Sequence, residues 1–147
     1  MSTPAPTIYF AGSIRGGRDD APIYSALIDA LGKYGRVLTE HIGGAELTAS
    51  GEDAAPREIH DRDLGWIKSS DFLVAEVTTP SLGVGYEIAR ATEWRKPVLC
   101  LFRPNAGKSL SGMIAGCPGV TVREYTTIGE AEAIFEGYFA AVIAGSP

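Results

Sequence analysis

Short apolar runs alternate with segments of helical periodicity along the chain, and this alternation constrains the fold more than any other feature. The runs are a few residues long, which is typical of buried strands. They cover residues 8–11, 36–38, 72–75, 98–102 and 120–125. Helices are expected near residues 20–35, 54–68 and 83–95, and a closing helix at 130–143. Strands that alternate with helices in this way form a parallel sheet with helices on both faces.

Five strands in a chain of 147 residues predict an α/β protein, a flavodoxin-like or Rossmann-like three-layer sandwich with a five-stranded parallel sheet. The sequence has no internal repeat and no linker-like segment, so residues 1–147 are expected to form a single domain. Ligands of such sheets bind beyond the carboxyl ends of the strands. We therefore expect the functional residues in the loops that begin at Gly12, Val77 and Arg103.

Charge and composition limit the partners of the chain. Its net charge of -5 argues against binding a nucleic acid polymer, although a few local donors can hold one phosphate. The sequence has neither an apolar run of membrane-spanning length nor a secretory pattern at residues 1–7, so we expect a cytoplasmic protein, or a nuclear one in a eukaryote, that does not bind membranes. Cys100 and Cys117 form no CxxC pair, which predicts two reduced thiols and no metal site.

The glycine-rich loop at residues 12–17 is a candidate anion site. It follows the first apolar run and precedes a helix, where backbone N–H groups bind anions. Ser13 adds a hydroxyl and Arg15 adds a fork of charged donors. The loop matches neither the GxGxxG nor the GxxxxGK[ST] pattern, so neither dinucleotide nor triphosphate binding follows. The alternative interpretation is a flexible turn between strand and helix.

The segment from Thr78 to Glu87 follows the third apolar run and therefore lies at the expected ligand edge. Ser81, Gly83 and Gly85 leave room for a ligand to approach the backbone closely. Glu87 is expected in the first or second turn of a helix, where the helix dipole favours the ionised carboxylate that a nucleophile must be. The alternative is an ordinary glutamate that only complements the dipole.

Three other polar residues are candidates for the site. Asp63 shares a helix face with His60, so it could bind a sugar hydroxyl or manage a proton on a departing base, or it could belong to a solvated charged face. Tyr9 is near the end of the first strand, where its hydroxyl could reach a carboxylate or simply pack. Ser111 could complete a phosphate clamp. His60 and His41 have no partners at metal-ligand spacing, so we interpret both as polar surface or supporting residues.

Taken together, several segments resemble the nucleoside 2-deoxyribosyltransferase superfamily, and within it the N-hydrolases of 2'-deoxynucleoside 5'-monophosphates. The segments that carry this resemblance are residues 8–17, 38–41, 75–78, 80–87 and 99–104. The resemblance implies a flavodoxin-like fold, a homodimer, and hydrolysis of a deoxynucleoside monophosphate to free base and 2-deoxyribose 5-phosphate without a cofactor. The chain departs from the family pattern at residues 46–57 and beyond Gly116, which leaves the preferred base open.

The resemblance also implies roles for individual residues. Glu87 matches a nucleophilic glutamate that forms a covalent glycosyl intermediate, Tyr9 matches the tyrosine that positions it, and Asp63 matches an aspartate near the sugar and base. Ser111 matches a serine that the neighbouring subunit delivers to the phosphate. The residues that match the lining of the sugar-phosphate pocket are Gly12, Ser13, Ile14, Arg15, Gly16, Ser81 and Gly83.

Three other functions remain open from the sequence. A deoxyribosyltransferase would use the same Glu87 intermediate and pass the sugar to a second base, although a clamp of Arg15, Ser81 and Ser111 would favour a 5'-phosphate over a free hydroxyl. A ribonucleotide hydrolase would act on a monophosphate such as CMP. A nucleotide-sensing module would bind without cleaving, and it would not need an ionised carboxylate at the sugar.

Overall fold

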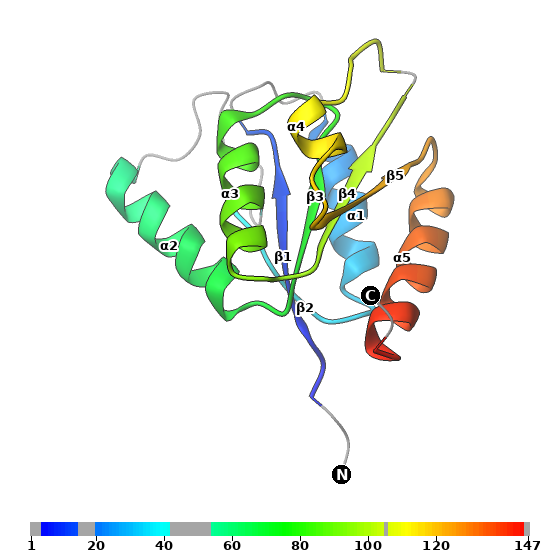
Figure 1. The fold of residues 1–147 in the computed structure, drawn as a ribbon, viewed down its shortest axis with the longest axis horizontal. Coiled ribbons are helices and arrows are strands. Elements are labelled where there is room, and N and C mark those ends of the chain that lie inside the picture. The colour runs from blue at the N-terminus through cyan, green and yellow to red at the C-terminus, as the bar shows by residue number, and fades with distance from the viewer. Residues whose placement is uncertain (1–3, 15–19, 42–53, 105, 146–147) are drawn as a thin grey trace.

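The computed structural model describes residues 4–14, 20–41, 54–104 and 106–145, which form a parallel sheet between two layers of helices (Figure 1). The strands are β1 (Thr7–Gly12), β2 (Arg36–Leu38), β3 (Phe72–Glu76), β4 (Val98–Phe102) and β5 (Val120–Glu124). The helices are α1 (Ala21–Leu31), α2 (Pro56–Ser69), α3 (Leu82–Glu93), α4 (Gly112–Ala115) and α5 (Ile128–Ile143). The strand order β2-β1-β3-β4-β5 is that of flavodoxin-like sheets. The predicted three-layer α/β sandwich is therefore confirmed.

Strand β1 divides the interior into two apolar cores, because successive side chains of a strand point to opposite faces. Ile8 and Phe10 pack in the core that α1 and α5 cover. Tyr9 and Ala11 pack in the core that α2 and α3 cover. Both cores also take alternate residues of β3 and β4, so burial on each face fixes the register of the central strands. This arrangement turns Tyr9 towards the helices that carry Asp63 and Glu87.

Glycine at position 35 permits a close approach between two backbone segments. A Cβ atom at Gly35 would lie 2.2 Å from the carbonyl oxygen of Pro6, so a side chain there would displace the chain. The amide of Arg36 donates to the same oxygen at 2.9 Å, which brings the start of β2 against β1. Helix α1 ends at Leu31, four residues before the end that the sequence predicted.

Side-chain caps define the start of helices α3 and α5. Ser81 accepts a hydrogen bond from the amide of Val84 at 3.2 Å, and Thr127 accepts one from the amide of Glu130 at 3.1 Å. Asp20 is at the corresponding position of α1, but its side chain makes no capping bond. The Asp20 carboxylate instead forms an ion pair with the Arg103 guanidinium.

A buried polar network connects the loops at the carboxyl ends of the strands. Glu76, which is fully buried, accepts hydrogen bonds from the amide of Thr78 at 2.7 Å, from Arg103 Nε at 3.0 Å and from the hydroxyl of Tyr125. Arg103 Nη2 is 2.9 Å from Asp20 Oδ2. Because a buried carboxylate needs such partners, the network holds together the chain after β1, β3, β4 and β5.

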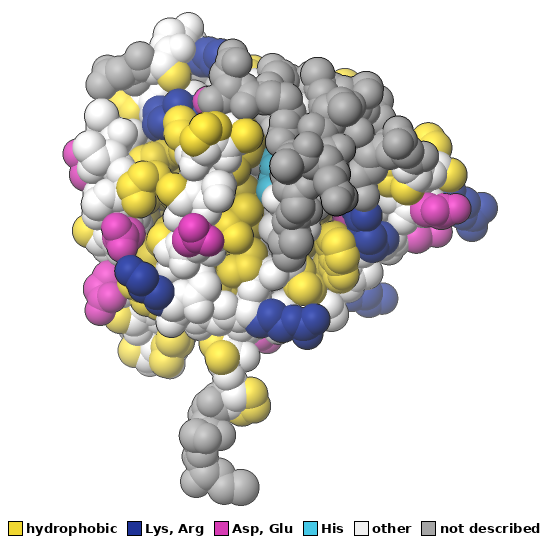
Figure 2. All heavy atoms as spheres, turned by 180° about the vertical axis from the view of Figure 1, so that it is seen from behind, with side chains coloured by type: hydrophobic (Ala, Val, Ile, Leu, Met, Phe, Trp, Pro, Cys, Tyr) yellow, Lys and Arg dark blue, Asp and Glu magenta, His cyan; other side chains and the backbone are white. Residues whose placement is uncertain are grey.

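The face turned away from the viewer in Figure 1 has no extended basic field among the described residues. Figure 2 shows its Lys and Arg side chains as separate groups, with Asp and Glu side chains between them. This distribution is unlike the basic stripe that binds a nucleic acid backbone. In the described part of the chain, the helices are either too short or too polar to cross a membrane.

Candidate active site

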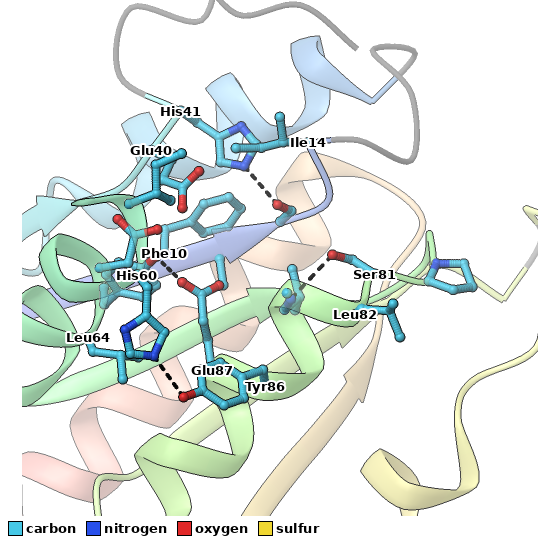
Figure 3. Close-up of a pocket in the computed structure, with 18 residues that line it drawn as sticks. Phe10, Ile14, Glu40, His41, His60, Leu64, Ser81, Leu82, Tyr86 and Glu87 are labelled. Carbon is cyan, nitrogen blue, oxygen red and sulfur yellow. Dashed lines mark hydrogen bonds between the residues drawn. The ribbon is translucent and has the colours of Figure 1, made fainter. Parts of the chain in front are cut away.

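A cavity of about 420 Å³ lies at the carboxyl ends of the strands, and this volume is typical of small-molecule sites. Residues of β1, the turn after β2, helix α2 and the β3–α3 connection line it. Figure 3 shows the carboxylate of Glu87 in the middle of the lining, with Glu40 above it and Ser81 to its right. The cavity therefore has an acidic end at Glu40 and a hydroxyl-bearing end at Ser81.

Glu87 is held by a hydrogen bond from Tyr9. The Tyr9 hydroxyl, which β1 carries into the core, donates to Glu87 Oε2. Burial and the nearby Glu87 raise the pKa of Tyr9, so its hydroxyl remains a donor. The structure thus brings together the two residues for which the sequence predicted nucleophile and positioning roles.

The protonation state of Glu87 differs from the sequence-based expectation. Burial raises the pKa of Glu87 from 4.5 to about 7, the hydrogen bond from Tyr9 lowers it, and the charge of Glu40 raises it. The helix dipole acts mainly within the first turn, whereas Glu87 is in the second turn of α3. Near neutral pH the carboxylate is therefore only partly ionised, and Tyr9 rather than the dipole supplies the main stabilisation of the charge.

Asp63 forms an ion pair at the acidic end of the cavity. It is buried on α2, and both Nε and Nη2 of Arg62 are 2.9 Å from its Oδ1. The guanidinium of Arg62 also lies over the ring of Trp66, 4.6 Å from the ring centroid, and its Nη2 is 3.8 Å from Glu40 Oε1. Arg62 thus binds Asp63 directly and places a positive charge near Glu40.

Three carboxylates meet in this cavity. One oxygen from each of Glu40, Asp63 and Glu87 lies within 4.8 Å of the others, which is close enough to hold a cation. Arg62 already provides a positive charge to two of them. Carboxylates at this spacing also share protons, because ionising all three is unfavourable. The cluster can therefore present both an ionised nucleophile and a protonated acid to a bound ligand.

The other end of the cavity contains Gly12, Ile14, Ser81 and Gly83. A Cβ atom on Gly83 would meet only Ser81 Oγ, at 3.8 Å, so the space beside this backbone is open to a ligand. Ser13 is buried beside the cavity and is not among its lining residues. The predicted contributions of Arg15 and Gly16 lie outside the described residues.

Glycine at position 12 allows a histidine to pack against the strand end. A Cβ atom there would lie 3.1 Å from the ring of Tyr24 and 3.3 Å from His41 Nε2. The His41 ring, 4.9 Å from that of Tyr24, makes a 3.0 Å hydrogen bond between Nε2 and the Gly12 carbonyl. His41 therefore lines the cavity, whereas the sequence indicated only a surface or supporting residue.

Ser111 lies outside this cavity. It is the exposed cap of α4 and lines a second groove of about 690 Å³ between α3 and residues 109–117. Two apolar side chains of the groove are unusually exposed, Leu82 by 97% and Met113 by 84%. Within one chain, Ser111 and Glu87 are therefore in neighbouring depressions, which meet at the β3–α3 connection.

The sequence prediction missed the residues that follow β2. Glu40 and His41 line the cavity, yet the loops expected to matter followed β1, β3 and β4. Because β2 is a parallel neighbour of β1, its carboxyl end reaches the same edge, and this topology was the signal for Glu40. His60, which was interpreted as a surface or supporting residue, joins α2 to α3 at the rim through a 2.8 Å hydrogen bond to the Tyr86 hydroxyl.

Comparisons with known proteins agree on one family. The sequence model described as nucleoside 2-deoxyribosyltransferase matches residues 8–124. The 5-hydroxymethyl-dUMP N-hydrolase of Homo sapiens is 50% identical over 141 residues, which cover 92% of this chain and 80% of that protein. The protein of the same name from Esox lucius is 52% identical over 138 residues, which cover 90% of this chain and 94% of that protein.

Among solved structures, the CMP N-glycosidase of Clostridium botulinum superposes with a TM-score of 0.62 and covers 88% of this chain and 98% of its own. Its sequence identity of 17% supports a shared fold only. The family match and the two relatives extend over most of the chain, including every element that lines the cavity. The chain therefore belongs to the nucleoside 2-deoxyribosyltransferase family.

Proposed function

We propose that this protein hydrolyses the N-glycosidic bond of 2'-deoxynucleoside 5'-monophosphates, with 5-hydroxymethyl-dUMP as a substrate. The products are the free base and 2-deoxyribose 5-phosphate. The observation that carries the proposal is the position of the Tyr9-bound carboxylate of Glu87, in a cavity with acids at one end and Ser81 and Gly83 at the other. The names of the two relatives, at about half identity, support the substrate class.

In the first step, Glu87 Oε1 attacks the anomeric carbon. The bond between this carbon and the base nitrogen breaks, and its electron pair leaves with the base, which takes a proton from the Asp63 carboxylic acid. Positive charge develops on the sugar and the Glu87 carboxylate stabilises it, while Tyr9 keeps Oε2 in place. A 2'-deoxy sugar lacks the electron-withdrawing hydroxyl, so this charge forms more readily.

In the second step, water attacks the same carbon and the bond to Glu87 breaks. Asp63 takes the proton from the water, and Glu87 is released as a carboxylate that again accepts a hydrogen bond from Tyr9. Two displacements at one carbon give net retention of configuration. Every proton is exchanged between water, base and side chains of the site, so the scheme uses no cofactor.

The phosphate is proposed to bind at the end of the cavity formed by Gly12, Ile14, Ser81 and Gly83. This end includes the N-terminus of α3, where N–H groups and the helix dipole attract an anion. We also propose that Ser13, Arg15 and Gly16 of the loop at residues 12–17 bind this phosphate.

A direct assay tests the activity. The purified protein is incubated with 5-hydroxymethyl-dUMP, dUMP, dGMP, CMP and a deoxynucleoside without phosphate, and free base is measured by chromatography. We expect base release from the deoxynucleotides to be at least about 100-fold faster than from CMP or the nucleoside. CMP carries the 2'-hydroxyl that disfavours charge on the sugar, and the nucleoside lacks the phosphate that the site binds. Release from CMP alone, or transfer of the sugar to an added second base, would support the rival activities instead.

The proposal includes a homodimer in which each chain delivers Ser111 to its partner's phosphate. The groove that contains Ser111 shares Pro80, Ser81, Leu82 and Val84 with the lining of the Glu87 cavity. The exposed side chains of Leu82 and Met113 supply apolar surface of the kind that interfaces bury. A second copy placed over this groove would bring its Ser111 to the Ser81 end of the cavity.

Mixing two variants tests the shared site. Ser111→Ala is expected to raise KM for the monophosphate about tenfold, which corresponds to one lost hydrogen bond to a charged group. In a heterodimer of one Ser111→Ala chain and one Glu87→Gln chain, one of the two sites is complete. It has Glu87 from the Ser111→Ala chain and Ser111 from the Glu87→Gln chain. The mixture should therefore recover the low KM, whereas a serine that acts within its own chain would leave KM high.

The proposed place of action is the cytoplasm, with the nucleus as the alternative in a eukaryote. Nucleoside monophosphates are intracellular metabolites, and Cys100 and Cys117 are both free thiols, as a reducing compartment maintains them. Burial raises the pKa of the Cys100 thiol to about 12, which keeps it unreactive.

A further inference from the structure

Glu40 is a cavity residue that the proposed reaction does not use. It lies two residues after the end of β2, and its side chain is only 18% exposed. Its carboxylate is within 4.8 Å of those of Asp63 and Glu87. Figure 3 shows it beside the Glu87 carboxylate and away from Ser81. Glu40 is half-buried beside Arg62, and a bound substrate would fill the cavity space next to its carboxylate.

The position of Glu40 relative to a substrate follows from the proposed function, on which this inference rests. With the anomeric carbon at Glu87 and the phosphate near Ser81, the base extends towards Glu40 and Asp63. On a pyrimidine, the carbon that carries the 5-substituent is bonded to C6, which is itself bonded to the glycosidic nitrogen. A 5-substituent therefore leaves the ring on the C6 edge and points away from the sugar, towards the acidic end of the cavity where Glu40 and Asp63 lie.

The chemistry of Glu40 selects for a hydrogen-bond donor. An ionised carboxylate only accepts hydrogen bonds, so it favours an O–H group and gains nothing from a methyl group. Arg62 places a positive charge near this acceptor, since its Nη2 lies 3.8 Å from Glu40 Oε1 while its guanidinium is packed over Trp66. Asp63 is bound more closely by the same guanidinium, at 2.9 Å, and already has the proton-transfer role.

We propose that Glu40 is a specificity-determining residue that accepts a hydrogen bond from the hydroxyl of a 5-hydroxymethyl pyrimidine. The enzyme thereby distinguishes 5-hydroxymethyl-dUMP from dTMP, whose 5-methyl group differs from it by a single oxygen atom. A site built to bind a substrate hydroxyl rejects the analogue that lacks it, since the polar group of the site then loses its partner.

The test compares kcat/KM for 5-hydroxymethyl-dUMP and dTMP in the wild type, Glu40→Ala and Glu40→Gln. We expect the ratio of the two values to fall at least about tenfold in Glu40→Ala, mainly through slower turnover of the hydroxymethyl substrate. Glu40→Gln should give an intermediate ratio, because its amide oxygen still accepts a hydrogen bond without the charge. Glu58→Gln is the matched control, since Glu58 is exposed on α2 outside the cavity and should leave the ratio unchanged.

The outcomes separate this inference from the proposed function. If the wild type releases base from neither nucleotide, the proposed function fails and the inference fails with it. If the wild type cleaves both and the Glu40 variants lower both values equally, the function stands and the specificity role is overturned. Should Glu40→Ala not fold, as judged by circular dichroism, an unchanged ratio in folded Glu40→Gln overturns the proposal and a reduced ratio supports it.

Discussion

Replacing Glu87 with glutamine is expected to reduce kcat for base release by at least about 1,000-fold, because the amide cannot form the glycosyl bond. Glutamine has the same shape, and its amide oxygen can still accept the hydrogen bond from Tyr9. Nucleotide binding at the Ser81 end should therefore remain, which titration calorimetry with the monophosphate can measure. Glu93→Gln, on an exposed part of the same helix, is the control and should keep full activity.

The same variant should be more stable than the wild type at alkaline pH. The folded-state pKa of Glu87 is raised from 4.5 to about 7, so the folded protein favours the protonated acid. This stabilisation is present below pH 4.5 and is lost as the pH rises through 7, where the buried group must ionise. By linkage, Glu87→Gln should raise the free energy of unfolding at pH 9 by up to about 3 kcal/mol and have little effect at pH 4. Lower stability of the variant at pH 9 would contradict the burial argument.

The pH dependence of catalysis follows from the same carboxylate. In the proposed reaction only ionised Glu87 attacks the sugar, so kcat/KM should fall about tenfold per pH unit below its pKa of about 7 and level off above it. At pH 5 the loss should reach about 100-fold. The charged and titratable groups that face Glu87 are Tyr9, Glu40, Arg62 and Asp63.

Tyr9→Phe distinguishes this titration from that of the substrate phosphate, whose second pKa is about 6. The hydrogen bond from Tyr9 lowers the pKa of Glu87, so its removal should move the acid limb of the profile to higher pH. The titration of the phosphate would not move. An acid limb that stays in place in Tyr9→Phe would show that Glu87 is not the group being titrated.

The elements of the fold were predictable because their patterns are local. The central strands are continuous apolar runs, and helical spacing identified α1, α2, α3 and α5 within a few residues. Tyr9 and Glu87 were therefore placed at the correct sheet edge before their contact was known. What the sequence could not indicate is that Tyr9 turns towards α3 and bonds to Glu87, since this depends on strand register and helix packing.

Other features depend on tertiary structure. Glu40 follows the short edge strand β2, where no catalytic pattern marks it, and its approach to Asp63 depends on how α2 packs against the sheet. The raised pKa of Glu87 results from burial, which local helix position does not reveal. Asp20 has the sequence position of a helix cap but pairs with Arg103, because the network around Glu76 offers a charged partner. The proposed role of Ser111 requires a second chain, which no pattern within one chain can place.

Trapping the glycosyl intermediate tests the central claim most directly. A 5-hydroxymethyl-dUMP analogue with fluorine at C2' should react slowly, because the electronegative substituent destabilises the charged sugar in both steps and lets the intermediate accumulate. After digestion and mass spectrometry, the account predicts one fluorinated deoxyribose 5-phosphate per active site, attached to Glu87. Base release from the analogue without any adduct, or an adduct on another residue, would contradict it.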